Sequence, residues 1–369
     1  MPVTVPSRIC CPLTVHIRSG NTTRASWRAA SAMAQNSGDV LPAPFLDLSR
    51  VSDAHCHPQL DTAAISDIHT TPARTFAIMS VSHATWPAVD TACAHLPIGR
   101  AIPAFGIHPW WAHLHASSAY RTKRDILVTK PRPRASPEQA LAAAECALAA
   151  LPEPVPLDTW RDELRRRLEH DPGAIVGECG IDRAAEVLEG LPHAHHDDVL
   201  PHCRLECSEE HQWSVLGEHL ALAGELQRPI SLHCVRSYGR LEQELRVVAR
   251  RDAASIPPRV MLHSYGGSPE MVRNFVALPN GLGARVYFSF NAVVRNGRAK
   301  LLARVAAVPD DRVLVESDVT SVAGLAPGLR AAVELVAEAK GWSLPETAER
   351  VEANFRSFYE AQLRAVAAA

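Results

Sequence analysis

The sequence lacks any run of 18 apolar residues, so we expect no helix that crosses a membrane. It also lacks an excess of either charge, because 38 basic residues balance 40 acidic ones to a formal net charge of −2. Such a chain has no global field that draws it to nucleic acid or acidic lipid. If it handles a polyanion, it must do so with bound metal or with a local basic patch.

No disulfide framework is visible, because the nine cysteines are odd in number and scattered. This usage is typical of reduced thiols in a protein of the cytoplasm, the nucleus or the mitochondrial matrix. Acidic residues are absent from the first 38 positions, which carry four arginines and many serines and threonines. We expect residues 1–45 to form a disordered N-terminal tail, or the true start to be Met33; a mitochondrial targeting segment is the alternative.

Eight short apolar runs alternate with helical stretches over residues 46–365. Unbroken, β-branched runs of this length are typical of strands that are buried on both faces. Their alternation with helices predicts an α/β fold, a (β/α)8 TIM barrel. An open doubly wound sheet is the alternative, but no G-x-G-x-x-G follows the first run. The eight runs are residues 50–57, 75–81, 101–108, 174–180, 229–235, 259–265, 285–290 and 312–318.

Residues 116–157 do not fit the alternation, and we interpret them as an insertion after the third strand. They hold a basic run from Arg121 to Arg134, then a helical pattern that Ser136 and Gln139 open with capping-box spacing. The basic run is typical of a solvated, partly disordered loop. A surface that contacts phosphates or a protein partner is the alternative.

Polar residues recur at the carboxyl ends of the predicted strands. A TIM barrel gathers these ends on one face, where the active sites of this fold lie. Imidazoles and carboxylates are costly to bury together without a ligand. We therefore predict a site for two divalent metal ions. Its ligands are His55, His57, Glu178, His233, His263 and Asp318.

Strand alternation separates these ligands from their neighbours in the sequence. Adjacent strand residues point to opposite faces, so Cys56, Cys179 and Cys234 are expected to face the surrounding helices. A further group of histidines follows no predicted strand, and we leave it out of the site. That group is His193, His195, His196 and His202.

Seven further segments follow "DAHCH" in order: "GIHPWW", "AIVGECGID", "RPISLHC", "VMLHSYGGS", "VYFSFN", "VPDDRVLVESD" and "NFRSFY". Together they resemble the TatD-type metal-dependent deoxyribonucleases of the amidohydrolase superfamily, from about Val51 to about Tyr359. The "GIHPWW" and "ESD" forms are most similar to a fungal branch named for association with a subunit of the anaphase-promoting complex. The resemblance implies a metal-dependent hydrolase that cleaves phosphodiester bonds of DNA, with 3′–5′ exonuclease-like digestion.

The resemblance also implies the bridging role of Glu178, and the positions of other residues in the predicted site suggest roles for them. Glu178 is expected to bridge the two metals, and Asp318 to orient the activated water and take its proton. His108, at the end of the third strand, is expected to contact the scissile phosphate or the leaving oxygen. Trp110 and Trp111 are expected to stack on a base or, alternatively, to seal the barrel rim. The mixed donor set suits Zn or Mn, and phosphate chemistry suits Mg or Mn.

Several positions depart from the family's pattern. They surround the predicted ligands rather than replace them, so they bear on substrate preference more than on metal binding. They are Ser317 and Val319 around the last Asp, Arg236 displaced by one position behind Val235, His219 in place of a Gln, and Arg183 in place of an aromatic residue.

Two other functions remain open from the sequence. A small-molecule amidohydrolase on the same barrel often bridges its metals with a carbamylated Lys from the fourth strand; here Glu178 holds that place and no Lys lies near it. A scaffold that binds a cell-cycle assembly through the insertion is the second alternative. Metal content separates the two classes, because a scaffold does not need two metals per chain.

Overall fold

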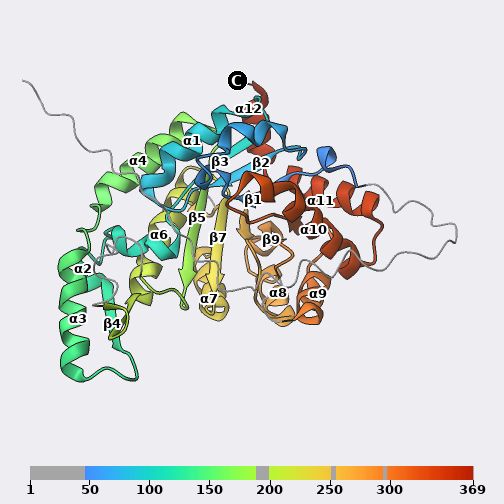
Figure 1. Ribbon diagram of the computed structural model, residues 1–369. Coiled ribbons are helices and arrows are strands. Elements are labelled where there is room, and N and C mark those ends of the chain that lie inside the picture. Colours follow the sequence, from blue (N-terminus) through green and yellow to red (C-terminus); the bar gives the residue numbers. More distant parts are fainter. Residues whose placement is uncertain (1–45, 188–198, 251–254, 294–296, 369) are drawn as a thin grey trace, which may run out of the picture. The chain divides into compact units, whose positions relative to one another are not determined.

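The computed structural model describes residues 46–368, apart from 188–198, 251–254 and 294–296. Eight parallel strands form one sheet in which each strand pairs with the next along the chain (Figure 1). Each strand overlaps one of the eight predicted runs, and the predicted (β/α)8 barrel is confirmed. The strands are β1 (Asp53–Cys56), β2 (Phe76–Met79), β3 (Ala101–Phe105), β5 (Ile175–Asp182), β7 (Ile230–Val235), β8 (Val260–Leu262), β9 (Val286–Phe290) and β10 (Val313–Val315).

The first and last strands meet through hydrogen bonds at their carboxyl ends. The backbone N–H of Asp318 donates to the carbonyl of His55 at 3.0 Å, and that of His57 donates to Val319 at 2.9 Å. The contacts that close the barrel therefore also fix three predicted ligands relative to one another.

The barrel interior is filled by apolar side chains at alternate strand positions, as the pleat requires. Three aromatic residues from the end of the chain, Phe355, Phe358 and Tyr359, pack against this interior. The Tyr359 hydroxyl donates to the carbonyl of Ala54 at 2.9 Å. The strand-borne part of this interior consists of Ala54, Ala77, Met79, Ile102, Ala104, Ile175, Met261, Tyr287 and Leu314.

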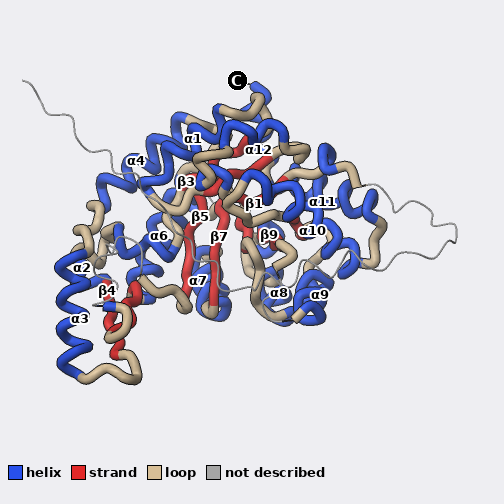
Figure 2. Tube along the Cα trace, in the orientation of Figure 1, coloured by secondary structure: helices blue, strands red, loops and turns tan. Residues whose placement is uncertain are grey.

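A second apolar layer packs the strands against the surrounding helices. Figure 2 shows these helices around the strands. Cys56, Cys179 and Cys234 belong to it, so their predicted outward orientation is confirmed. Two short 3-10 helices, η2 (Pro58–Leu60) and η3 (Ile65–Thr70), join β1 to β2. The α-helices of this layer are α1 (Trp86–Ala94), α4 (Leu157–His170), α6 (Glu209–Glu225), α7 (Tyr238–Val248), α8 (Pro269–Val276), α9 (Arg298–Ala307), α10 (Val322–Lys340) and α11 (Leu344–Phe358). The last helix, α12 (Glu360–Ala368), packs Leu363 against the barrel interior instead.

Residues 116–157 are more regular than predicted. They contain α2 (Lys123–Ile126), β4 (Leu127–Pro131) and α3 (Pro137–Ala150), and the predicted capping box of Ser136 and Gln139 is confirmed. β4 pairs antiparallel with β6 (Cys203–Cys207), a strand that the sequence analysis missed.

The basic run within this segment is not a solvated loop. Much of it lies in α2 and β4, and four of its cations pair with carboxylates from more distant parts of the chain. Lys130 lies against Glu206, and Arg132 against Glu186 at 2.8 Å. The prediction of a partly disordered loop is wrong here, because pairing with β6 orders the strand.

Histidine burial makes the stability of the barrel depend on pH. His219 is fully buried on α6, its ring stacked on Trp160 at 5.2 Å, and its Nδ1–H donates to the Val215 carbonyl at 2.8 Å. Burial lowers its pKa to about 4, and the bond to Val215 opposes this only in part. Since the folded pKa lies below the unfolded value of about 6.5, protonation of the unfolded chain removes stability as the pH falls.

We therefore expect His219 to reduce the free energy of unfolding by roughly 1 kcal/mol between pH 6.5 and 5.5. The variant His219→Gln should lose this part of the pH dependence. Denaturant unfolding at the two pH values measures it, with the exposed His95→Gln as the control. An identical pH dependence in wild type and His219→Gln would contradict the prediction.

Candidate metal centre

All six predicted ligands lie together at the carboxyl end of the barrel. They lie in β1, β5 and β7, or one to three residues after the ends of β1, β8 and β10. Their side chains keep at most 19 % of their surface exposed. Folding therefore gathers four imidazoles and two carboxylates in a space that is largely closed to water.

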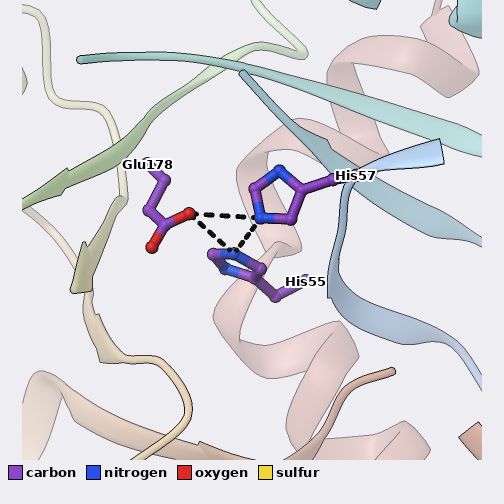
Figure 3. A group of neighbouring side chains, drawn as sticks. All are labelled: His55, His57 and Glu178. Carbon is purple, nitrogen blue, oxygen red and sulfur yellow. Dashed lines mark hydrogen bonds and ion pairs between the residues drawn. The ribbon is translucent and has the colours of Figure 1, made fainter. Parts of the chain in front are cut away.

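The Glu178 carboxylate lies in the middle of this cluster. Its Oε2 is 3.3 Å from Nε2 of His55 and 3.2 Å from Nε2 of His57 (Figure 3). The two imidazole nitrogens are themselves only 3.1 Å apart. Three potential donor atoms from β1 and β5 thus face one another.

The other oxygen of Glu178 faces a different pair of histidines. Its Oε1 is 2.8 Å from Nδ1 of His233 and 2.6 Å from Nε2 of His263. The nitrogens of these two rings are 3.0 Å apart. One carboxylate therefore separates two groups of imidazole nitrogens, one at each oxygen.

Asp318 approaches the first group from β10. Its Oδ1 lies 3.8 Å from Nε2 of His57 and 4.0 Å from Nε2 of His55, and its Oδ2 accepts a hydrogen bond from Asn291 at 3.1 Å. Its backbone has a φ of +54°, in the left-handed region that non-glycine residues seldom adopt. Such backbone conformations cluster at functional sites.

The outer nitrogens of these histidines show which tautomer faces the cluster. Nδ1 of His57 lies 2.8 Å from the carbonyl of Met79, which can only accept, so its Nε2 carries the lone pair when the ring is neutral. Nε2 of His233 points at the Asp182 carboxylate at 3.4 Å, which leaves the lone pair on its Nδ1. This is the arrangement in which an outer acceptor orients a metal-ligating imidazole. The donor set fits divalent cations.

His108 faces the cluster with its protonated nitrogen, unlike His57 and His233. The backbone N–H of Trp110 donates to its Nδ1 at 3.1 Å, so a neutral ring carries its proton on Nε2. That Nε2 lies 3.4 Å from Oε1 of Glu178 and 3.2 Å from Nδ1 of His233. His108 therefore presents a hydrogen-bond donor to the cluster rather than a lone pair.

Burial and charge compete in the protonation of the cluster. Burial alone would raise the pKa of the Glu178 carboxyl, but His263, His108 and His55 hold it well below its usual range. Burial also lowers the pKa of His108. It disfavours a charged His263, yet the adjacent Glu178 outweighs burial and raises that pKa well above its ordinary value. A metal held at Nε2 of His263 would therefore take the place of a proton.

Asp182 is a residue of the site that sequence reasoning missed. It ends β5, and its Oδ2 accepts a hydrogen bond from the indole of Trp110 at 2.8 Å while it faces His233. Gln212 on α6 holds its backbone on both sides, with bonds of 2.8 and 3.2 Å. Asp182 therefore connects a half-exposed Trp to a predicted ligand.

We expect Asp182→Asn to weaken metal binding roughly 10- to 100-fold, because His233 loses the charge that orients its ring. Titration calorimetry of the metal-free chain with Mn²⁺ measures this. Asp158→Asn, on the exposed first turn of α4, is the control. Equal affinities for Mn²⁺ in wild type and Asp182→Asn would contradict the role.

Glu316 and Asp53 support the cluster from behind. Glu316 is fully buried, accepts the backbone N–H of Ser264 at 2.7 Å, and lies 3.8 Å from Nδ1 of His263. Asp53 accepts the backbone N–H groups of His55 at 3.2 Å and Ser317 at 3.0 Å. Burial raises the pKa of Asp53 to about 7. Both carboxylates fix the strand ends that carry the ligands.

A protein-family model described as TatD related DNase matches residues 52–360. The chain belongs to this family. This TatD-related chain is 27 % identical over 339 residues to Cut9-interacting protein scn1 of Schizosaccharomyces pombe. The aligned region covers 84 % of this chain and 99 % of scn1. It is also 27 % identical over 172 residues to Uncharacterized deoxyribonuclease YMR262W of Saccharomyces cerevisiae, 45 % of this chain and 49 % of that protein.

Solved structures share the fold of the TatD-related chain at low sequence identity. The TatD homolog YJJV of Escherichia coli superposes with a TM-score of 0.56 at 17 % identity, over 85 % of this chain and 99 % of that one. An uncharacterized amidohydrolase from Saccharomyces cerevisiae superposes with a TM-score of 0.55 at 13 % identity, over 85 % and 100 %. At these identities the likeness shows the barrel and not the activity.

The remaining predictions concern residues away from the cluster. Of the histidine group left out of the site, His193, His195 and His196 lie outside the described residues, and His202 lies in a turn before β6. The N-terminal tail, residues 1–45, also lies outside them. Within the part of the chain that the structure describes, no helix combines the length and the apolar character needed to cross a membrane.

Proposed function

We propose that this TatD-related chain hydrolyses phosphodiester bonds of DNA in a reaction that depends on two divalent metal ions. The observation that carries the proposal is the Glu178 carboxylate, whose two oxygens face two separate groups of imidazole nitrogens. Family membership supports a metal-dependent hydrolase. The name of YMR262W, a deoxyribonuclease, supports DNA as the substrate.

We assign the six predicted ligands to two ions. His55, His57 and Asp318 would hold one, His233 and His263 the other, with Glu178 shared between them. Two such ions, Mg²⁺, Mn²⁺ or Zn²⁺, supply a water of lowered pKa and positive charge that offsets the phosphate. This charge accounts for DNA binding by a chain of net charge −2.

Asp318 and His108 are the residues that we propose to move or hold protons. Asp318 is the most exposed of the six carboxylate and imidazole ligands and is held by Asn291, so it is placed to accept the proton of the attacking water. His108 presents Nε2–H to the cluster and would donate to a phosphate oxygen or to the leaving oxygen.

Degradation of 3′-labelled and 5′-labelled single-stranded DNA under titrated Mg²⁺ and Mn²⁺ tests the proposal. We expect metal-dependent shortening from the 3′ end, which His55→Ala/His57→Ala abolishes. Cys56→Ala is the matched control, because Cys56 lies between the two histidines and faces the outer layer. No cleavage by a folded, metal-loaded wild type would refute the deoxyribonuclease function, and shortening from the 5′ end would refute the polarity.

Binding to a protein partner is a second candidate function. It is favoured by the similarity to scn1 along almost its whole length, since scn1 is named for interacting with Cut9. We propose α2, β4 and α3 for this contact, because they lie to one side of the barrel strands (Figure 1). A chain that serves only as a scaffold would show neither two bound metals nor hydrolysis.

A further inference from the structure

A cavity of about 400 Å³ opens beside the metal centre and reaches α9. His233, His263 and Asp318 line one end of it, and Arg304 of α9 lines it together with Tyr238. This volume lies within the range of small-molecule sites. The cavity therefore has room for more of a substrate than the phosphate that is cleaved.

Arg304 has no carboxylate partner among the described residues, although it is half-buried. The neighbouring hydroxyls have partners of their own: that of Tyr238 accepts the backbone N–H of Gly266 at 2.8 Å, and that of Tyr265 donates to the carbonyl of Ser268 at 3.0 Å. On the same helix, Arg298 forms an exposed ion pair with Glu338. A partly desolvated guanidinium without an anion is costly, so the position suits an anion from outside the chain.

The other charged residues that line the cavity also favour the binding of an anion. Arg236 lines it, is exposed, has no ion pair within the described chain, and has a backbone φ of +59°. Asp318 is the one carboxylate among the described lining residues, and Asn291 holds one of its oxygens. The part of the cavity away from the metal centre is therefore cationic. Its remaining wall includes the apolar side chains of Phe290 and Leu301.

We propose that Arg304, assisted by Arg236, binds a second phosphate of the substrate, next to the one that is hydrolysed. The guanidinium fork matches phosphate oxygens in a bidentate manner, which a point charge does not. The inference rests on the proposed function, because the scissile phosphate must lie at the metal centre. It makes the enzyme selective for nucleotides or strands in which a phosphate neighbours the scissile bond. That phosphate is either a terminal monoester or an internal diester.

Dinucleotide hydrolysis by the full-length, metal-loaded chain tests this selectivity. The substrates are TpT, which has only the scissile phosphate, pTpT and TpTp, which add a terminal one, and TpTpT, which adds an internal one. We expect wild type to prefer at least one of the last three over TpT in kcat/KM. Arg304→Gln should reduce that preference roughly 10- to 100-fold, mainly through KM. The substrate that is preferred identifies the source of the second phosphate.

Two variants control the experiment. Arg304→Lys should retain part of the preference, and Arg298→Gln should behave as wild type because its ion pair lies on the surface. A wild type without preference, or an Arg304→Gln variant that keeps the whole preference, would overturn the inference.

A binding measurement separates failure of the inference from failure of the proposed function. Calorimetry with Mn²⁺ present compares thymidine 3′,5′-bisphosphate with thymidine 5′-monophosphate. We expect wild type to bind the bisphosphate at least roughly tenfold more tightly, and Arg304→Gln to lose the difference. If the bisphosphate binds more tightly but no dinucleotide is cleaved, the result supports the second phosphate site and contradicts the nuclease function. If dinucleotides are cleaved but the two ligands bind with equal affinity, the result supports the nuclease function and contradicts the second phosphate site.

Discussion

Glu178→Gln is expected to reduce metal-dependent DNA hydrolysis on the order of a thousandfold and to lower the number of bound metals. Both oxygens of the carboxylate face imidazole nitrogens, at distances of 2.6 to 3.3 Å. An amide replaces one of these oxygens with a donor NH₂ group. That group points at lone pairs on one side of the cluster, so one metal position is lost whichever way the amide turns.

Elemental analysis of the purified variant and digestion of labelled single-stranded DNA measure the two effects. Glu163→Gln is the matched control, because Glu163 lies on α4 and pairs with His83, outside the candidate metal centre. A Glu178→Gln enzyme that binds two metals and keeps its rate would show that the bridge assignment is wrong.

The second large effect is expected from Gly180→Ala, which should lower the free energy of unfolding by about 3 kcal/mol or more. Gly180 lies in β5 with a φ of +150°. A Cβ atom there would lie 2.0 Å from the carbonyl oxygen and 2.9 Å from the backbone nitrogen of His233. Since both are backbone atoms of the neighbouring strand, the clash can be relieved only by separating β5 from β7.

Gly217→Ala is the matched control for this prediction. Gly217 is exposed within α6, and a Cβ atom there meets nothing within 4 Å. The substitution should therefore raise the free energy of unfolding by roughly 0.5 to 1 kcal/mol, through helix propensity. Denaturant unfolding of both variants measures the contrast. A Gly180→Ala chain as stable as wild type would contradict the packing of these two strands.

The convergence of the six predicted ligands could be foreseen because it depends on two local patterns. Short apolar runs identify the strands, and the carboxyl ends of barrel strands share one face. Asp182 and Glu316 had the same kind of signal, since each lies an even number of residues from a predicted ligand, Glu178 or Asp318, and so shares its face. What separates these two residues from the predicted ligands is that their carboxylates face histidines of other strands, His233 and His263, and this is visible only in the structure.

The small sheet of β4 and β6 was not predictable in the same way. Its strands are far apart in the sequence, and β4 is almost fully exposed, so it shows no buried face. The ion pair between Lys130 and Glu206 joins the two strands, so it forms only after they meet. Non-local pairing, rather than local propensity, decides the structure of this segment.

Metal add-back tests the central claim most directly. The full-length chain, freed of metal with a chelator, is titrated with Mn²⁺ while its rate of DNA hydrolysis and the bound metal are measured together. A two-metal centre bridged by Glu178 predicts no activity without metal and a rate that reaches its plateau at two bound ions per chain. A plateau at one bound ion, or hydrolysis by the metal-free chain, would contradict the account.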